Sequence, residues 1–232
     1  MGDGSGIALY CRFGTDALML DRRIMIAAAA LALSGGPALA AGVPAGVVQG
    51  DMSLGDLKAK VHVTEYASAS CPHCARFDQE VWPAFKKKYV DTGRVYYTLK
   101  EFLTPPQEVA AAGFLIARCG GKAKYFPILD GVFRSQAEWT SDSVREPLLK
   151  VAKAHGLTEA QVDACTSDEA ALKALNARFE AAMGKDGVRS TPTFDINGQR
   201  IEGETDLATL DAAIAKARSA AAGPAASQRK GR

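Results

Sequence analysis

Two stretches of the chain alternate hydrophobic and polar residues, and a stretch with helical spacing separates them. Residues 59–67 and 94–102 are rich in β-branched and aromatic residues, which is typical of strands. The residues between them predict a helix from Pro72 to about Val90, kinked at Pro83, because apolar side chains recur there at helical spacing: Phe77, Val81, Trp82, Phe85 and Tyr89. The pattern therefore predicts a unit of strand, helix and strand.

Nearly every residue from Gln107 to Asp186 fits a helical pattern. We expect the helices of this block to break at small residues: Gly120-Gly121, Gly131, Gly156, Ser167 and Gly184. Thr158 and Gln161 match a capping box, in which the two side chains satisfy free backbone N–H groups at the start of a helix. The block is too long for a simple crossover between two strands, so it predicts a helical layer.

A hairpin and a last helix are expected near the C-terminal end. Residues 193–196 and 200–201 have strand character, and Asn197-Gly198 between them is a typical hairpin turn. Residues 206–221 predict a closing helix, and residues 223–232 a disordered tail without periodicity. Strands that alternate with helices indicate an α/β fold. Because the 232 residues contain no internal repeat and no Pro/Ser-rich linker, we expect one domain.

The first forty residues predict a signal peptide that is cleaved. Arg22-Arg23 precede an apolar run over residues 24–33, and residues 37–40 end in the small-x-small pattern of a cleavage site. The alternative is a transmembrane anchor, but the run has only about half of the roughly 20 apolar residues that a span needs. We therefore expect a soluble, exported domain over residues 41–222. The arginine pair also occurs in twin-arginine signals, but two arginines are ordinary in a general secretory signal, so we expect the general secretory route.

The net charge does not indicate a type of partner, whereas the number of cysteines predicts disulfides. The formal net charge is +2 and 47% of the residues are hydrophobic, which gives no indication of nucleic-acid binding. Removal of the leader removes Cys11 and leaves four cysteines: Cys71, Cys74, Cys119 and Cys165. An even number of cysteines in an oxidising compartment favours two disulfides.

The tetrad Cys71-Pro72-His73-Cys74 lies at the turn from the first predicted strand to the first helix. Pro72 suits the first helical position, so the Cys71 sulfur becomes the N-cap and faces free N–H groups and the positive end of the helix dipole. These groups, together with the His73 ring, are expected to lower the pKa of Cys71. A stabilised thiolate makes the disulfide a stronger oxidant. Cys74, one helical turn later, is expected to be the more buried, resolving cysteine.

Two other interpretations of the C-x-x-C pattern have to be weighed. Half of a zinc site needs a second pair of ligands, but the sequence has neither another C-x-x-C nor an H-x-x-x-H pair, so we expect no metal site. The other alternative is an inert structural disulfide. The exported context, the preceding strand and the helix-opening Pro72 favour a redox dithiol over both.

Residues 65–74 (EYASASCPHC) and 190–194 (STPTF) resemble the DsbA family of periplasmic disulfide oxidoreductases, and the resemblance extends over most of the mature chain. It implies a thioredoxin-like fold into which a helical domain is inserted, here at about residues 105–187. Some relatives carry a second bridge, so we expect Cys119 and Cys165 to form a structural disulfide. The alternative is that these two cysteines are buried separately.

The resemblance also implies the roles of the site residues. Cys71 is the expected nucleophile, Cys74 resolves the mixed disulfide, and Pro192 is a cis-proline that faces both. Thr191 is expected to offer its backbone to an extended substrate, and Pro72 to line the same surface. Thr191 departs from the valine of the best known strong oxidases and is commoner in isomerase-type members, which leaves the direction of electron flow open.

Glu65 matches the acidic residue that the family places beneath the active site, where it relays a proton from Cys74. The alternative is an exposed glutamate at a strand edge. Lys100, on the neighbouring predicted strand, is a candidate partner for the Glu65 carboxylate.

A function and its partners follow from the resemblance. The expected reaction is disulfide formation in reduced, unfolded or extended exported proteins, by the redox-active Cys71–Cys74 bridge and without a cofactor. The implied setting is the periplasm, where a DsbB-like, quinone-linked membrane oxidase restores the bridge of a monomeric enzyme. One alternative is an isomerase or reductase kept reduced in the periplasm. Another is a copper-binding or chaperone module, although the sequence lacks the Met or His clusters that such a site often adds.

Overall fold

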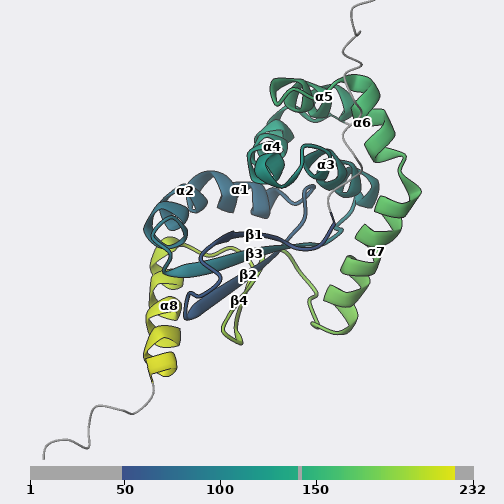
Figure 1. Ribbon diagram of the computed structural model, residues 1–232. Helices are drawn as coiled ribbons and strands as arrows, with labels where there is room; N and C mark the ends of the chain where they lie inside the picture. The colour runs from purple at the N-terminus through teal and green to yellow at the C-terminus, as the bar shows by residue number, and fades with distance from the viewer. Residues whose placement is uncertain (1–48, 141–142, 223–232) are drawn as a thin grey trace, which may run out of the picture. The chain divides into compact units, whose positions relative to one another are not determined.

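Five strands form one sheet in the computed structural model, which describes residues 49–140 and 143–222 (Figure 1). Their spatial order is β1 (Met52–Gly55), β3 (Val95–Glu101), β2 (Val61–Ala67), β4 (Thr193–Ile196) and β5 (Gln199–Glu202). β2 and β3 are parallel, and every other neighbouring pair is antiparallel. The signal peptide predicted at residues 1–40 and the tail predicted at residues 223–232 lie outside the described residues.

The predicted unit of strand, helix and strand is confirmed, but its helix is interrupted. α1 (Pro72–Glu80) is followed by α2 (Trp82–Phe85) and by a π-helical segment, η1 (Lys86–Val90). The helix breaks because Pro83 has no N–H to donate to the preceding turn. After the break, aromatic side chains still reach the sheet, since the Trp82 ring centroid lies 4.4 Å from that of Tyr97 on β3.

The predicted helical layer is formed by α3 (Gln107–Cys119), α4 (Lys122–Ser135), α5 (Arg145–Ala154), α6 (Glu159–Thr166) and α7 (Glu169–Gly184). The capping box of Thr158 and Gln161 is confirmed at the start of α6. The break predicted at Gly131 is wrong, because α4 continues through this residue. A Cβ at Gly131 would lie 2.7 Å from a methyl group of Val151, so the glycine serves the close approach of α4 and α5.

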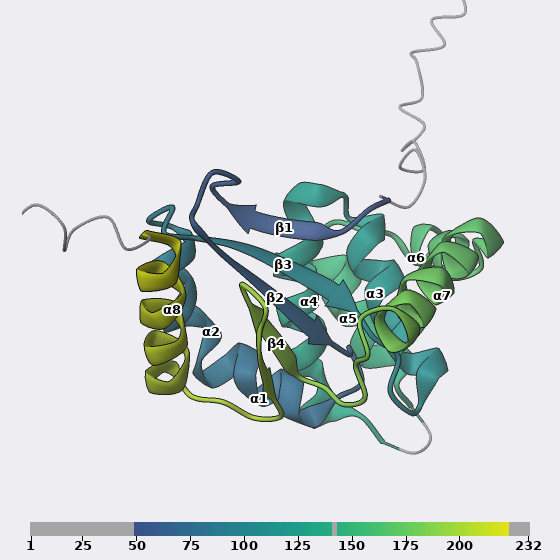
Figure 2. The ribbon, with the colours of Figure 1, turned by 90° about the horizontal axis from the view of Figure 1, so that it is seen from below.

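The C-terminal elements match their prediction, whereas one edge strand was not predicted. The hairpin of β4 and β5 turns at Asn197-Gly198, both at positive φ, and α8 (Leu207–Ala222) follows. The unpredicted strand is β1, which pairs with β3. Four residues are too few for a clear alternating pattern. Figures 1 and 2 show α1, α3 and α4 on one face of the sheet, and α7 and α8 near opposite ends of the other face.

A buried ionic network joins the helical layer to the sheet. Alternation along β3 turns Glu101 toward the core, where its side chain is fully buried. One carboxylate oxygen accepts hydrogen bonds from Arg118 Nε of α3 at 2.6 Å and from the Tyr125 hydroxyl of α4 at 3.0 Å. The other accepts two from Arg178 of α7, at 2.8 and 3.0 Å. The Glu101 carboxylate therefore accepts hydrogen bonds from side chains of three helices of the layer, α3, α4 and α7.

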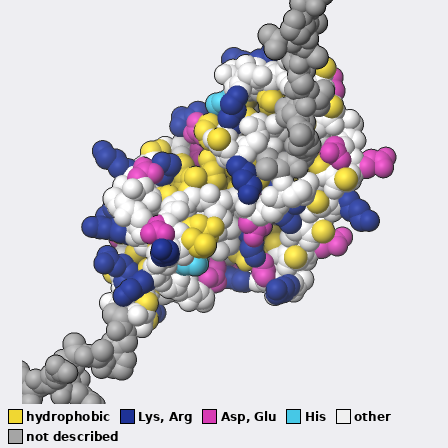
Figure 3. Space-filling model, viewed as in Figure 1, with side chains coloured by type: hydrophobic (Ala, Val, Ile, Leu, Met, Phe, Trp, Pro, Cys, Tyr) yellow, Lys and Arg dark blue, Asp and Glu magenta, His cyan; other side chains and the backbone are white. Residues whose placement is uncertain are grey.

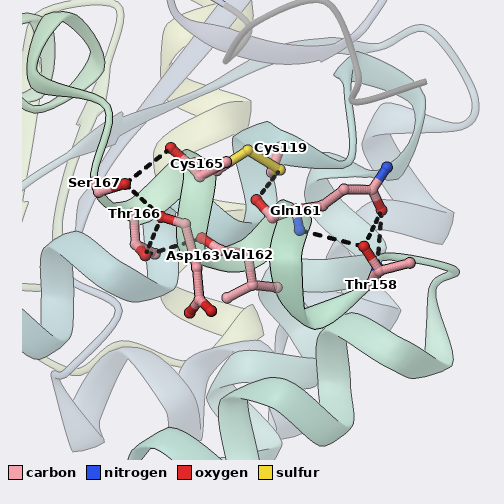
Figure 4. Close-up of a disulfide and its surroundings, with 9 residues drawn as sticks. Cys119, Thr158, Gln161, Val162, Asp163, Cys165, Thr166 and Ser167 are labelled. Carbon is pink, nitrogen blue, oxygen red and sulfur yellow. Dashed lines mark hydrogen bonds between the residues drawn. A yellow bond between two sulfur atoms is a disulfide. The ribbon is translucent and has the colours of Figure 1, made fainter. Parts of the chain in front are cut away.

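A disulfide joins Cys119, the last residue of α3, to Cys165 in α6 (Figure 4). Their Cα atoms are 6.0 Å apart, and both residues are buried. The bond closes a loop over a sequence separation of 46 residues and links the first helix of the layer to its fourth. It therefore restricts the unfolded chain across most of the layer.

Removal of this bond is expected to destabilise the protein substantially. The chain-entropy argument predicts that the double variant Cys119→Ala/Cys165→Ala loses about 4 kcal/mol of unfolding free energy. Urea unfolding of the variant and the wild type, both with the active-site cysteines oxidised, measures the difference. A double variant as stable as the wild type would contradict the expected contribution of the cross-link.

Charged side chains of both signs are distributed over the surface. On the face shown in Figure 3, Lys and Arg side chains are interspersed with acidic, hydrophobic and uncharged ones. Across residues 49–140 and 143–222, no helix combines the length and the hydrophobicity needed to cross a bilayer.

Candidate active site

Cys71 occupies the predicted N-cap position of α1, with Pro72 as the first helical residue. The Cys71 sulfur accepts a hydrogen bond from the backbone N–H of Cys74 at 3.3 Å. The backbone N–H of Cys71 donates to the Ser68 carbonyl at 3.0 Å, which closes the turn after β2. The sulfur is therefore fixed at the positive end of the helix, where a negative charge is stabilised.

The surroundings of Cys71 favour its thiolate. A hydrogen bond from the Cys74 thiol is the largest influence on the pKa of Cys71, which falls to about 6 although partial burial opposes the shift. Thr191 and the backbone N–H groups of His73 and Cys74 lower it further. Cys71 is thus largely ionised at neutral pH.

Cys74 has the opposite tendency. Its side chain is completely buried, and burial raises its pKa well above the ordinary value. The hydrogen bond to Cys71, and the charges of Cys71 and Glu65, raise the pKa of Cys74 further. The dithiol therefore has one reactive thiolate and one protonated thiol, and these are the properties expected of an attacking and a resolving cysteine.

Glu65 lies beneath the dithiol in the centre of the sheet. β3 and β4 flank β2, so the alternative of an exposed glutamate at a strand edge is excluded. Its side chain accepts a hydrogen bond from the Tyr97 hydroxyl at 2.5 Å. Burial raises the pKa of Glu65 to about 8, against a lowering by Tyr97, and the charge of Cys71 adds to the increase. Glu65 can therefore hold or release a proton near neutral pH.

Lys100 does not contact Glu65. In the parallel register Lys100 is opposite Tyr66, the residue after Glu65, and consecutive residues of a strand point to opposite faces. Lys100 instead forms an ion pair with Asp186 at 2.8 Å. The suggested partner is therefore wrong, and the Glu65 carboxyl is held by Tyr97.

The buried acid gives a prediction for stability. The pKa of Glu65 is raised on folding, so the group favours the folded state below its ordinary pKa of 4.5 and loses that contribution as the pH rises to about 8. Glu65→Gln removes this dependence and is expected to stabilise the dithiol form by about 3 kcal/mol at pH 7, and far less at pH 4.5. Urea unfolding at several pH values tests this, with the exposed Glu80→Gln as control. A difference that stays constant with pH would contradict it.

A loop that precedes β4 faces the two cysteines. The peptide bond between Thr191 and Pro192 is cis, and the Cys71 sulfur lies 3.4 Å from the Thr191 carbonyl oxygen. The Pro192 carbonyl accepts a hydrogen bond from Gly203 N–H at 2.8 Å, which joins this loop to the end of β5. The resemblance alone suggested this juxtaposition, because about 120 residues separate the two segments.

The His73 ring has Glu204 as a partner. Its Nδ1 atom contacts the carboxylate of Glu204, which also accepts a hydrogen bond from Arg76 Nη1 at 2.6 Å. The influence of His73 on the pKa of Cys71 comes from its backbone N–H, and a contact between its ring and the Cys71 thiolate stays a prediction. Glu204 was missed because no local pattern marks a residue that is 131 positions away in sequence.

Gln136, which was not predicted as a site residue, holds the active-site turn. Gln136, in the 3-10 turn η2 (Gln136–Glu138) after α4, donates its side-chain amide to the carbonyls of Ala69 at 2.9 Å and Cys71 at 3.3 Å. The helical layer therefore contacts the active site directly. Within the described ranges, no group of three or more His, Cys, Asp or Glu side chains is arranged to hold a metal ion.

Comparisons with known proteins agree with this geometry. A family model described as Thioredoxin matches residues 48–216. A Rickettsia bellii protein named as a protein-disulfide oxidoreductase is 32% identical over 171 residues, or 73% of this chain and 65% of the relative. The chain therefore spans less than two thirds of the length of that relative.

Solved structures with the same fold come from other bacteria. The crystal structure of Wolbachia pipientis alpha-DsbA1 is 26% identical with a TM-score of 0.70, and the match covers 77% of this chain and 96% of that one. A protein-disulfide isomerase from Novosphingobium aromaticivorans is 25% identical with a TM-score of 0.62, over 73% and 98% of the two chains. In both cases nearly the whole solved chain is matched, so the inserted helices are part of the shared fold.

Proposed function

This chain belongs to the thioredoxin family, and on that premise we propose that it is a DsbA-type thiol–disulfide oxidoreductase that forms disulfides through Cys71 and Cys74. The observation that carries the proposal is the asymmetry of the pair. The pKa of Cys71 is lowered to about 6, whereas burial raises the pKa of Cys74 well above its ordinary value. A stabilised Cys71 thiolate favours the reduced enzyme and so makes its disulfide an oxidant.

The reaction starts from the oxidised Cys71–Cys74 bridge. A substrate thiolate attacks the Cys71 sulfur, the bond to Cys74 breaks, and a mixed disulfide forms between substrate and Cys71. Cys74 leaves as a thiolate and takes up a proton, which the neutral Glu65 carboxyl, with a pKa of about 8, can donate. A second substrate thiolate then attacks the substrate sulfur and releases Cys71 as its stabilised thiolate. Two electrons pass to the enzyme, and the substrate gains a disulfide.

The substrate surface is formed by the turn of α1 and the loop before β4. Pro72 is exposed at the start of α1, and the Thr191 carbonyl lies beside the Cys71 sulfur. An extended peptide pairs its backbone with Thr191 while its cysteine reaches Cys71, which is recognition by strand addition. The substrates are reduced, unfolded or extended exported proteins in the periplasm, and a DsbB-like, quinone-linked membrane oxidase restores the bridge.

Equilibration with glutathione redox buffers tests the proposal. An oxidase is expected to be half-reduced near the potential of strongly oxidising members, about −120 mV, because its dithiol form is stabilised. The Cys119→Ala/Cys165→Ala variant serves as the control. It lacks the second disulfide, so any exchange with glutathione that it shows comes from Cys71 and Cys74. An equilibrium near the thioredoxin value of about −270 mV would contradict disulfide formation as the function.

The second candidate function is a disulfide isomerase or reductase. Thr191 before the cis-proline and the likeness to the Novosphingobium isomerase favour it. Such an enzyme has to be kept reduced, so the same glutathione titration separates it from an oxidase. A copper-binding or chaperone module differs from both, since it would leave reduced peptides unoxidised.

A further inference from the structure

Glu204, in the loop between β5 and α8, contacts α1, the helix that begins at the active-site cysteines. Its Oε1 atom contacts His73 Nδ1 and accepts a hydrogen bond from Arg76 Nη1 at 2.6 Å. Both partners are in the first two turns of α1, whose N-cap is Cys71. One carboxylate therefore holds two side chains that can carry positive charge, on residues two and five positions after Cys71 in the same helix.

The position of Glu204 is fixed from both sides of its loop. Gly203, at φ +84°, donates its N–H to the Pro192 carbonyl at 2.8 Å, so Glu204 directly follows a residue bound to the cis-proline loop. Two residues later, the Asp206 carboxylate accepts a hydrogen bond from Thr209 N–H at 2.8 Å at the start of α8. The contact with His73 and Arg76 is therefore built into the loop between β5 and α8.

Glu204 also borders an open cavity next to the active site. The cavity has a volume of about 440 Å³, and His73, Arg76, Glu204 and Thr205 lie on its wall. The other acidic groups that line it are Glu80 of α1 and Asp206. Two of the charged side chains on its wall, Arg76 and Glu80, belong to α1, the helix whose N-cap is Cys71.

The chemistry of the contact sets its effect on Cys71. His73 and Arg76 hold the pKa of Glu204 below its ordinary value, so Glu204 is a carboxylate at neutral pH. A neutral His73 that donates from Nδ1 has no proton on Nε2 to give to a thiolate. When His73 is protonated, Glu204 offsets its charge, as it offsets that of Arg76. In both states Glu204 weakens the stabilisation that α1 gives to the Cys71 thiolate.

We propose that Glu204 is a positioning residue that limits the oxidising strength of the Cys71–Cys74 couple, by orienting His73 and Arg76 and offsetting their charge. The inference rests on the proposed function, because the property that Glu204 adjusts is the oxidising strength of the same Cys71–Cys74 pair. It follows that removing the charge of Glu204 makes the enzyme a stronger oxidant, while removing the charge of Arg76 makes it a weaker one.

The variant Glu204→Gln tests this, because it keeps the size of the side chain and removes its charge. Titration of the thiolate by its ultraviolet absorbance is expected to show the pKa of Cys71 lower by about half a unit. The glutathione equilibrium is expected to shift about threefold toward the dithiol. Both shifts are expected to shrink at high salt, since these side chains are partly exposed and salt screens them.

Three further variants separate this effect from a general change of charge or structure. Arg76→Gln is expected to shift both readouts in the opposite direction, which a merely structural disturbance would not do. Glu204→Asp keeps the charge and is expected to restore most of the wild-type values. Glu202→Gln removes an exposed charge two residues earlier and is expected to leave both readouts at the wild-type values.

The outcomes distinguish this inference from the proposed function. A wild-type protein that fails to exchange with glutathione overturns the proposed function, although the thiolate titration still reports on Cys71. A wild-type protein that exchanges, together with a Glu204→Gln variant whose Cys71 titration is unchanged or shifted upward, overturns the inference alone. Equal shifts for Glu202→Gln and Glu204→Gln also overturn it, because the effect then does not depend on the contact with His73 and Arg76.

Discussion

Cys71→Ala is expected to reduce the oxidation of a dithiol test peptide to the uncatalysed rate. Cys71 is the sulfur with the lowered pKa, and it lies beside the Thr191 carbonyl where an extended substrate pairs. Cys74 cannot replace it, because its side chain is fully buried. The measurement is the loss of free thiols from the peptide in the presence of oxidised enzyme.

Two controls make this result specific. Cys74→Ala, given the same peptide in its disulfide form, is expected to accumulate a mixed disulfide. The Cys71 thiolate attacks one peptide sulfur, the other leaves as a thiolate, and no Cys74 thiol is present to resolve the bond. Cys119→Ala/Cys165→Ala is expected to keep oxidising the peptide, because that disulfide lies between α3 and α6 in the helical layer. A Cys71→Ala protein that oxidises the peptide at the wild-type rate would refute the proposed mechanism.

Glu101→Gln is expected to lower the free energy of unfolding by about 3 to 5 kcal/mol. The change removes the carboxylate to which the Arg118 guanidinium, with a relative exposure of 1%, donates a hydrogen bond in the core. It also weakens the contacts of α4 and α7 with β3, because Tyr125 and Arg178 bind the same carboxylate. Urea unfolding followed by circular dichroism measures the loss.

The matched control is an ion pair at the surface. Lys150 and Glu138 form a pair whose side chains are 73% and 53% exposed, so Lys150→Gln is expected to leave the unfolding midpoint nearly unchanged. Similar losses for Glu101→Gln and Lys150→Gln would show that burial of the Glu101 network does not determine its contribution.

Local signals predicted those parts of the fold that local physics determines. Pro72 at the first position of α1, the capping box at Thr158 and the turn at Asn197-Gly198 depend on neighbouring residues, and the structure has all three. Gly131 was interpreted as a helix break because its contact with Val151 of α5 leaves no mark in the surrounding sequence.

In the candidate site, too, the features set by neighbouring residues were predictable and those set by tertiary contacts were not. The N-cap geometry of Cys71 was predictable from the tetrad, whereas the loop at Thr191 and Pro192 required the family resemblance. Glu204 and Gln136 were not predicted, because a glutamate or glutamine that acts through tertiary contact resembles any surface residue in a single sequence. The fold, and not the local pattern, brings them to the active site.

The hydrogen bonds from Gln136 to the Ala69 and Cys71 carbonyls limit how this protein can be simplified. A minimal version that joined β3 directly to β4 would keep the cysteines, the cis-proline loop and most of the sheet. It would also leave the backbone carbonyls of the active-site turn without their amide donor and open the side of α1 that packs on α4. The helices between the two strands therefore support the active-site turn, and a simplified version cannot omit them without replacing that support.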